Sequence, residues 1–551
     1  MPIATKIIPP TPSAYSYQLL IKHLLTTPLT YSPNQEIVYR DKLRYSYTDF
    51  VRRVARLANA LEGIGIKPGQ TVAVMDWDSH RYLECFFAIP MMGAVLHTIN
   101  IRLTSEQLIY TINHAEDDVI LVNQDFLPML EAVKDRFETV KKIIVLSDEG
   151  IKPKSTLNIA DEYENLLAQS ADYYNFPDFD ENSVATTFYT TGTTGLPKGV
   201  YFSHRQLVLH TYAISATYCA FKSQANLTST DVYMPITPMF HVHAWGVPYM
   251  VTLIGAKQVY PGRYEPDVLL KLHQKEKVTF SHCVPTILHM LLTSPAVKDA
   301  NLKGWKIIIG GSALPRGLAR EALNRGINVY AGYGMSETCP VLTVANLKPE
   351  MLKWDAEKQL NVRCRTGLPV PGAYVTVVDP NGKPLPHDGV STGEVVVRTP
   401  WLTQGYLKDP EKSESLWAGG WLHTGDIGFF DKEGYLQVTD RLKDVIKTGG
   451  EWVSSLTLED IISQHPAISE AAVIGTPDEK WGESPMALVV PKDAYKEKIT
   501  EEELIDFFKR FVDEGVIPKY GIPKRVLIVD AIAKTSVGKM NKKELRKQYN
   551  S

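Results

Sequence analysis

The chain has 551 residues, more than one compact core usually holds, so two or more domains with a cleft between them are expected. Hydrophobic residues make up 44% of the chain and charged residues 22%, without an extended low-complexity tract, which excludes a disordered tail or linker. The 59 Lys and Arg residues nearly balance 62 Asp and Glu residues, for a net charge of -3. The chain therefore has no overall attraction for nucleic acid, and any anionic ligand must be held locally.

The cysteines and the two ends of the chain indicate the cellular compartment of the protein. The five cysteines are widely spaced and never form a CxxC pair, which argues against a disulfide framework or a zinc site and favours a reducing compartment. The longest apolar run, residues 85 to 96, is shorter than the ~20 residues needed to cross a bilayer. Neither end carries a recognised targeting signal. We predict a cytoplasmic protein without an integral membrane segment, which leaves transient contact with a membrane surface open.

In chain order, helix and strand patterns alternate before residue 366. Residues 49 to 63 place apolar side chains at helical spacing, and residues 68 to 75 then have the pattern of a turn followed by a buried strand. Apolar strands that run into glycine-bearing turns recur at residues 141 to 146, 306 to 309 and 329 to 330. This alternation predicts an α/β fold, with a sheet flanked by helices.

The pattern changes twice in the second half of the chain. From about residue 366, short strands separated by Pro and Gly turns predict a small β subdomain at about 366 to 439. A charged segment at 440 to 445 then precedes a new set of helix and strand patterns, mixed α+β in character. We therefore expect a large N-terminal domain at 1 to 439 and a small C-terminal domain at 446 to 551.

A loop rich in glycine and threonine, YTTGTTGLPKGV, occupies residues 189 to 200. Glycines let backbone N–H groups approach an anion, hydroxyls add donors, and Lys198 supplies a positive charge, which together suit a phosphate-binding nest. Pro197 precedes Lys198, so the GxxxxGK[ST] spacing of a Walker A loop is not met. A flexible surface loop would have a similar composition. As a phosphate loop, the segment would contact ATP through Thr190, Thr191, Gly192, Thr193, Thr194, Gly195 and Lys198.

Five further motifs follow between residues 239 and 539. They are MFHVHAW (239 to 245), GYGMSET (332 to 338), TGD (424 to 426), DRLKDVIKTGGEWVSS (440 to 455) and KTSVGK (534 to 539). Together with the glycine- and threonine-rich loop, they resemble the adenylate-forming, AMP-binding superfamily of acyl-CoA synthetases, luciferases and peptide-synthetase adenylation domains. The fourth motif is most similar to that of medium- and long-chain fatty acyl-CoA synthetases. The resemblance implies a large N-terminal domain and a small mobile C-terminal one.

The resemblance assigns roles to residues that would otherwise be ordinary loop groups. It implies that Glu337 and Thr190 hold Mg²⁺, a hard cation that prefers oxygen ligands. It implies that Asp426, aided by Arg441, holds the ribose diol, because a carboxylate can accept both hydroxyl hydrogen bonds. Without the motifs, Glu337 would be taken for a solvated acid and Asp426 for part of an Asp-Gly turn. Further nucleotide contacts are implied for Gly311, Gly332, Tyr333 and Ser336.

Three lysines and a tryptophan carry implied roles at the domain junction and beyond it. Lys539 resembles the catalytic lysine that spans the carboxylate and the α-phosphate during adenylation, where a fixed cation is worth most. Lys443 matches the hinge position, at 440 to 445, about which the C-terminal domain turns, and it would also contact the nucleotide; a plain surface charge is the alternative. Lys447 and Trp452 would approach the nucleotide or the thiol path in one of two domain poses.

The segment MFHVHAW bears on the acid substrate. Its two histidines lie at i and i+2, but no third metal ligand is apparent, which argues against zinc. By resemblance, His241 orients the substrate carboxylate and Trp245 lines or closes the acyl tunnel; plain core packing is the alternative for Trp245. Amino-acid-activating relatives place an Asp in this segment, and the absence of an acidic residue here favours an apolar acid.

The motifs together imply an AMP-forming acid-thiol ligase. ATP and Mg²⁺ would convert a medium- or long-chain fatty acid into acyl-AMP and pyrophosphate, and CoA would then displace AMP. The chain ends soon after Lys539 without a carrier domain, so a diffusible thiol is the expected acceptor. Other apolar or aryl acids and a luciferase-like adenylating oxidase are alternatives, and the intact motifs disfavour a non-catalytic scaffold. The resemblance is also compatible with a homodimer.

Overall fold

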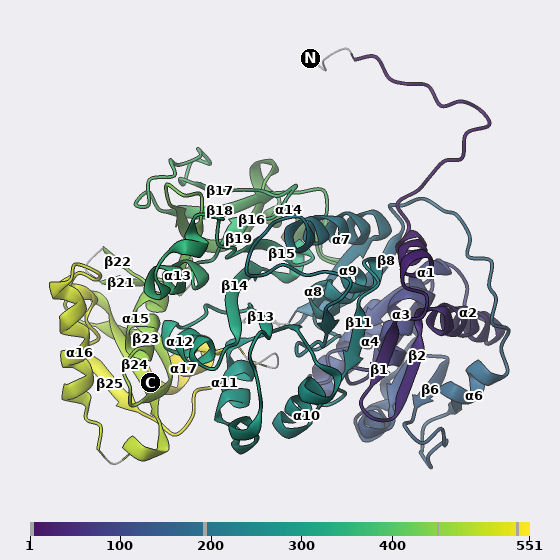
Figure 1. The fold of residues 1–551 in the computed structure, drawn as a ribbon, viewed down its shortest axis with the longest axis horizontal. Coiled ribbons are helices and arrows are strands. Elements are labelled where there is room, and N and C mark those ends of the chain that lie inside the picture. The colour runs from purple at the N-terminus through teal and green to yellow at the C-terminus, as the bar shows by residue number, and fades with distance from the viewer. Residues whose placement is uncertain are drawn as a thin grey trace.

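The computed structural model describes residues 5–190, 196–442, 444–448, 451–496, 498–535 and 539–550, with the backbone alone described at 451 and 452. Across these residues the strands form four sheets, and helices pack on the larger ones (Figure 1). The predicted α/β fold, with a mixed α+β C-terminal part, is confirmed. Within the described ranges, no helix has the length and apolar character needed to cross a bilayer.

A seven-stranded sheet forms the N-terminal part, in the order β7-β6-β5-β3-β4-β8-β9. Neighbouring strands are parallel except for the β8–β9 hairpin. Its central strands β3, β4 and β5 are almost entirely buried, as expected where helices cover both faces of a parallel sheet. The strands are β3 (Thr71–Met75), β4 (Val95–Thr98), β5 (Asp117–Asn123), β6 (Lys142–Leu146), β7 (Ile159–Glu162), β8 (Val184–Thr190) and β9 (Lys198–Ser203). The helices of this part are α1 (Thr26–Tyr31), α2 (Tyr47–Gly63), α3 (His80–Met91), α4 (Ser105–Ala115), α5 (Leu127–Glu131) and α6 (Tyr163–Ala168).

A nine-stranded sheet follows, in the order β16-β15-β14-β13-β12-β10-β11-β1-β2. Its strands are β1 (Glu36–Tyr39), β2 (Leu43–Ser46), β10 (Val232–Tyr233), β11 (Lys257–Tyr260), β12 (Phe280–Cys283), β13 (Lys306–Ile309), β14 (Asn328–Gly334), β15 (Val341–Val344) and β16 (Leu368–Pro369). The associated helices are α7 (His204–Cys219), α8 (Val242–Trp245), α9 (Val247–Leu253), α10 (Pro266–Glu276), α11 (Pro285–Thr293), α12 (Arg316–Asn324) and α13 (Ala356–Arg363).

Strand β14 differs from the sequence expectation. The glycines after residue 330 predicted a turn, but β14 continues to Gly334 and pairs with the antiparallel strand β15. A Cβ atom at Gly334 would lie 1.9 Å from the Pro340 carbonyl oxygen, so this glycine permits a close backbone crossing within the sheet. The extension matters for the site because it places Tyr333 at the end of a strand.

Two smaller sheets complete the fold. An antiparallel sheet contains β17 (Tyr374–Val378), β18 (Gly393–Arg398), β19 (Leu422–Phe430) and β20 (Leu436–Arg441), next to α14 (Pro410–Leu416). We call the part from Ile446 to Tyr549 the C-terminal lobe; it lies beside α12, at the opposite end of the molecule from α1 and α2 (Figure 1). It contains β21 (Ile446–Thr448), β22 (Glu451–Val453), β23 (Ile468–Asp478), β24 (Gly482–Pro491), β25 (Arg525–Ile528), α15 (Ser455–Ser463), α16 (Glu501–Asp513) and α17 (Lys542–Tyr549). The lobe has apolar clusters of its own, separate from the larger cores.

Local signals explain where several helices begin. Ser46 and Asp49 form a capping box at the start of α2, and Thr104 and Gln107 form one at the start of α4. Helix α3 is buried along its whole length and carries Glu84, whose side chain is fully buried. Arg53 of α2 pairs with Glu84 at 2.7 Å from Nε to Oε1, which neutralises this core acid.

We predict that Arg53→Met destabilises the N-terminal part by about 3 to 5 kcal/mol, because the Glu84 carboxylate would be left buried without its cation. The free energy of unfolding, measured by urea denaturation, tests this prediction. The double variant Arg53→Met with Glu84→Gln should recover part of the loss. A cost below about 1 kcal/mol for the single variant would contradict the assigned role of the pair.

Candidate active site

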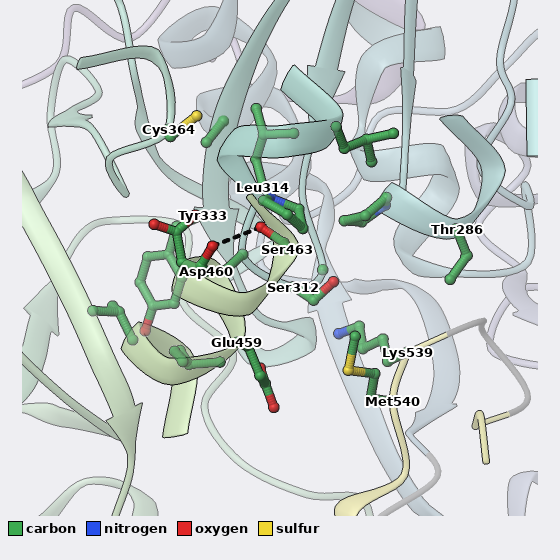
Figure 2. A pocket seen from close by; sticks show the side chains of 18 of the residues that line it. Thr286, Ser312, Leu314, Tyr333, Cys364, Glu459, Asp460, Ser463, Lys539 and Met540 are labelled. Atoms are coloured by element: carbon green, nitrogen blue, oxygen red, sulfur yellow. Dashed lines mark hydrogen bonds between the residues drawn. The ribbon is translucent and has the colours of Figure 1, made fainter. Parts of the chain in front are cut away.

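A cavity of about 1500 Å³ lies between the C-terminal lobe and the carboxyl ends of β13 and β14. Ligand sites commonly form at this edge of an α/β sheet. Figure 2 shows Tyr333, Lys539 and the α15 side chains of Asp460 and Ser463 around the cavity, with Lys539 extending toward Ser312. The cavity gathers these residues predicted from sequence: Thr190, Lys198, His241, Gly311, Gly332, Tyr333, Ser336, Glu337, Asp426, Arg441 and Lys539.

Other predicted site residues are placed differently. Trp245 lines a smaller adjoining cavity. Lys447, on β21, is exposed and lines neither of these two cavities; its backbone N–H donates to Glu483. Outside the described residues lie Thr191, Gly192, Thr193, Thr194, Gly195, Lys443 and the side chain of Trp452.

The β8–β9 hairpin positions the two ends of the predicted phosphate loop. Thr190, the last residue of β8, is paired with Lys198, the first residue of β9. The Lys198 ammonium lies 4.4 Å from the centre of the Tyr406 ring, a cation–π contact. The hairpin therefore presents a threonine hydroxyl and a positive charge to the same end of the cavity.

A buried carboxylate lies at the other side of the cavity. Asp426 of β19 accepts a hydrogen bond from the Tyr333 hydroxyl at 2.7 Å on Oδ2, and its Oδ1 pairs with Arg441 Nε at 3.2 Å. Burial raises the pKa of Asp426, while Arg441 and Tyr333 act against this shift. Each carboxylate oxygen has further acceptor capacity, so the group can still take hydroxyl hydrogen bonds. The phenol of Tyr333 is thereby fixed in place, with its ring lining the cavity.

Lys539 enters the cavity from the C-terminal lobe. Its Cε lies 3.0 Å from the position that a Cβ at Gly311 would take, and Gly311 has a φ of 79°. The positive φ favours glycine there, and a Cβ would also crowd the Lys539 side chain. Burial lowers the pKa of Lys539 to about 8, Arg441 acts in the same direction, and Asp426 and Glu337 oppose it. The ammonium therefore remains mostly charged at neutral pH and can bind an anion.

Glu337 also lines the cavity, just after the end of β14, the strand that carries Tyr333. Its side chain is buried, and Oε1 accepts a hydrogen bond from the Tyr406 hydroxyl at 2.8 Å. No group of three or more His, Cys, Asp or Glu side chains able to hold a metal occurs among the described residues. A single carboxylate beside a phosphate site fits a Mg²⁺ that arrives with the nucleotide, since phosphate oxygens supply other ligands.

His241 lines both cavities at the start of α8. Burial lowers its pKa to about 3, with Lys539 and Arg102 acting in the same direction, so the imidazole is neutral at physiological pH. It can then orient a carboxylate by hydrogen bonding without adding charge. His243 faces elsewhere: its Nε2 lies 2.8 Å from the Thr186 hydroxyl, and its ring contacts that of Phe86.

The residues after His241 form an unusual left-handed turn. The φ values from Val242 to Trp245 are 49°, 54°, 47° and 60°. Such a conformation costs about 1 to 2 kcal/mol per non-glycine residue. The turn ends at Gly246, where a Cβ would lie 2.8 Å from His210 Nδ1. Strain of this kind is typical of functional segments held by their surroundings.

Trp245 closes off the smaller cavity, which has a volume of about 30 Å³. Its indole packs against His282, with ring centres 4.9 Å apart, and reaches within 2.9 Å of a Cβ position at Gly310. Its side chain is thus both a cavity wall and part of the core.

The structure adds residues that the sequence analysis missed. Tyr406 contacts Lys198 and Glu337 at once, yet its Gly-Tyr-Leu context gives no local sign of a site. Arg102 and Tyr264 line the smaller cavity although neither belongs to a recognised motif. Each comes from a segment far away in the chain, so only the folded chain reveals them.

Contacts between the C-terminal lobe and α12 set the position of Lys539. The backbone N–H of Arg316 donates to Asp460 at 2.9 Å, capping the start of α12 from α15. A Cβ at Gly317 would lie only 2.3 Å from the Ser463 carbonyl oxygen. The two helices can therefore meet this closely only with glycine at 317.

The motifs, the fold and the cavity agree with comparisons to known proteins. Residues 27–407 match the family described as AMP-binding enzyme, and residues 457–539 match the AMP-binding enzyme C-terminal domain. A long-chain-fatty-acid–CoA ligase of Thermus thermophilus is 40% identical over 92% of this chain and 90% of its own length. A medium-chain-fatty-acid–CoA ligase of Ectopseudomonas oleovorans is 34% identical, over 97% and 96%. The solved structure of ATP-bound MatB from Rhodopseudomonas palustris has a TM-score of 0.81 at 27% identity, over 97% of this chain and 99% of that one.

The chain therefore belongs to the AMP-binding, adenylate-forming enzyme family.

We predict that Lys539→Ala slows acyl-AMP formation by roughly 10² to 10³ or more, the cost of losing a preorganised electrostatic group. Thioester formation from supplied acyl-AMP should fall much less. Rapid-quench assays of each half-reaction separate the two effects, and Lys534→Ala, an exposed lysine that pairs with Glu470, is the matched control. Equal loss in both half-reactions would remove Lys539 from the adenylation step.

Proposed function

We propose that this protein is a fatty acid-CoA ligase that activates a medium- or long-chain carboxylate through an acyl-adenylate. The chain is an AMP-forming acid-thiol ligase, with ATP and CoA as co-substrates and Mg²⁺ as cofactor. The observation that supports the proposal most is the convergence of Lys198, Glu337, Asp426 and Lys539 on one cavity from distant parts of the chain.

In the first half-reaction a carboxylate oxygen attacks the α-phosphorus of ATP, and the bond to the pyrophosphate oxygen breaks. Lys539 would bridge the carboxylate and the α-phosphate, where negative charge concentrates. Thr190, Lys198 and Ser336, with the loop at 191–195, would take up charge on the leaving pyrophosphate. Mg²⁺, held by Glu337 and Thr190 when bound, would neutralise phosphate charge.

The remaining nucleotide contacts follow from the cavity walls. Tyr333 would stack on the adenine, and Gly311 and Gly332 leave room for the base to lie against the backbone. Asp426 and Arg441 would bind the ribose hydroxyls. These contacts orient AMP as a leaving group for the second half-reaction, in which the CoA sulfur attacks the acyl carbonyl and the carbon–oxygen bond to AMP breaks.

The acid would bind with its carboxylate at His241 and its tail toward Trp245. The walls beyond His241 include Ile236, Val284 and Ile287, which suit an aliphatic chain. Because the described cavity holds about 30 Å³, a medium or long tail requires the Trp245 side chain to swing away. Release of the left-handed turn at 242 to 245 would offset part of the cost of that movement.

The second half-reaction would use another arrangement of the two parts of the chain. We propose a hinge at 440 to 445, centred on Lys443, between a domain of 1 to 439, with its β subdomain at about 366 to 439, and a mobile domain of 446 to 551. Lys447 and Trp452 would approach the nucleotide or CoA after this turn, consistent with the exposure of Lys447 here. Five free cysteine thiols support a reducing cytoplasm as the location. We also propose that the protein forms a homodimer.

A substrate panel tests the proposal. Purified protein is supplied with ATP, Mg²⁺ and saturated carboxylates from acetate to oleate-length chains, plus benzoate, each with and without CoA. We expect pyrophosphate release to be strongest with medium or long aliphatic acids, and AMP turnover to require CoA. Lys539→Ala serves as the inactive control.

Each other outcome of this panel has a definite meaning. Preference for acetate or butyrate would show that Trp245 stays closed and that the substrate is a short acid. Light emission or oxygen uptake in place of CoA dependence would favour an adenylating oxidase. Absence of pyrophosphate release with every acid would overturn the proposed function.

A further inference from the structure

A short segment that no motif marks crosses the base of the phosphate hairpin. We call residues 403 to 407 the crossing segment. Its Leu407 N–H donates to the Gly199 carbonyl at 2.8 Å, and its Thr403 hydroxyl donates to the Tyr201 carbonyl at 2.9 Å. Both acceptors lie on β9, which begins with Lys198. The crossing segment is thus fixed along the strand that carries the phosphate-site lysine.

The same segment is also bound to Glu337. The Thr403 N–H donates to the Glu337 carbonyl oxygen at 3.0 Å. The Tyr406 hydroxyl donates to the Glu337 side chain at 2.8 Å on Oε1. Glu337 is therefore held through its backbone and its carboxylate by one five-residue stretch.

Tyr406 lies between the two charged groups of the site. One face of its ring is 4.4 Å from the Lys198 ammonium, and its hydroxyl binds the Glu337 carboxylate. The backbone around Tyr406 is held closely, because the Tyr406 N–H donates to Ser413 Oγ at 2.8 Å and a Cβ at the preceding Gly405 would lie 2.3 Å from the same Oγ. Burial, and then the nearby Glu337, raise the pKa of Tyr406 far above its ordinary value, so the phenol remains a donor.

We propose that Tyr406 is a positioning residue that sets the spacing between the Mg²⁺ carboxylate and the phosphate lysine of this ligase. The proposal rests on the function proposed above, and it adds a residue that the motifs leave unassigned. The hydroxyl binds Oε1 of Glu337 and would leave Oε2 to take the cation. The ring contact would hold Lys198 beside this carboxylate, so that one Mg²⁺-bound triphosphate could meet both groups.

The two halves of the side chain are separable by substitution. Tyr406→Phe keeps the ring beneath Lys198 and removes only the hydrogen bond to Glu337. Tyr406→Leu removes both contacts. Losing a partner that orients a metal ligand typically changes metal affinity by about 10- to 100-fold. Because Tyr406→Phe keeps the ring contact with Lys198, loss of the hydroxyl should change only the Mg²⁺ requirement.

The first measurement uses binding without turnover. Calorimetric titration with α,β-methylene-ATP, which cannot be cleaved at the α-phosphorus, is run with Mg²⁺ and with EDTA. For Tyr406→Phe we expect about a 10-fold weaker Kd in limiting Mg²⁺ and no difference from wild type in EDTA. For Tyr406→Leu we expect weaker binding in EDTA as well, because Lys198 loses the ring.

Turnover gives a second, independent result. The Mg²⁺ concentration for half-maximal pyrophosphate release should rise about 10-fold in Tyr406→Phe, with kcat recovered at high Mg²⁺. Thioester formation from supplied acyl-AMP should be unchanged. Tyr435→Phe is the matched control, since it removes a buried hydroxyl bound to the Asn346 carbonyl outside this cavity.

The outcomes separate this inference from the proposed function. A wild-type protein that releases no pyrophosphate would contradict the proposed function. An active wild type, with Tyr406→Phe unchanged in Mg²⁺ dependence and in nucleotide Kd, would overturn the role of Tyr406. A kcat loss that high Mg²⁺ does not rescue, or a Kd change of equal size in EDTA, would assign Tyr406 to general packing and overturn it too. If Tyr406→Phe proves unstable, the nucleotide Kd of Tyr406→Leu is measured in EDTA instead. A Kd equal to that of the wild type would likewise overturn the role of Tyr406.

Discussion

The approach of the C-terminal lobe to α12 is the constraint on which the rest of the site depends. The large cavity has carboxylates at Glu337 and Asp426, and Lys539, the cation proposed to act between an acid and a phosphate, enters it from the C-terminal lobe. Lys539 passes against the backbone of Gly311, and α15 meets α12 at Gly317. The glycines at 311 and 317 thus leave room for the Lys539 ammonium to reach the cavity from the C-terminal lobe. The cost of burying that charge is visible in its pKa, lowered to about 8, and an anionic substrate would offset it.

The site also combines rigid and strained parts. Asp426, Tyr333 and Arg441 bind one another at the proposed ribose site, and the crossing segment at 403 to 407 binds Glu337 at the proposed phosphate site. By contrast, the left-handed turn at 242 to 245 stores strain next to the proposed acid site. This distribution suits an enzyme whose nucleotide is always the same and whose acid must be admitted and enclosed.

Much of this arrangement could be predicted from the sequence. Helical spacing and the glycine stop placed the helix at 49 to 63, which the structure extends by two residues to Tyr47. The motifs contain ten of the predicted residues that line the cavity, because each motif is a local string whose chemistry resembles that of a known family, and the resemblance also implied Gly311. The glycines after residue 330 misled the analysis: they permit a tight strand crossing there and do not mark a turn.

Tyr406, Arg102 and the contact of Arg316 with Asp460 could not be predicted, since each depends on segments that meet only in the folded chain. Nor does the sequence reveal that Asp426 shares its carboxylate with Tyr333 and Arg441. Local patterns report the chemistry of a residue, whereas its partners follow from topology. The residues that position others are therefore the ones that sequence reasoning misses most readily.

The central claim, that closure of the lobe onto α12 brings Lys539 into action, is tested most directly at Gly317. Gly317→Val would place a side chain against the Ser463 carbonyl, and Gly63→Ala, at a helix end with open space, is the control. The account predicts that acyl-AMP formation falls by roughly 10²-fold, because Lys539 is displaced, while thioester formation from supplied acyl-AMP persists. Acyl-AMP formation at the wild-type rate in Gly317→Val would contradict the account.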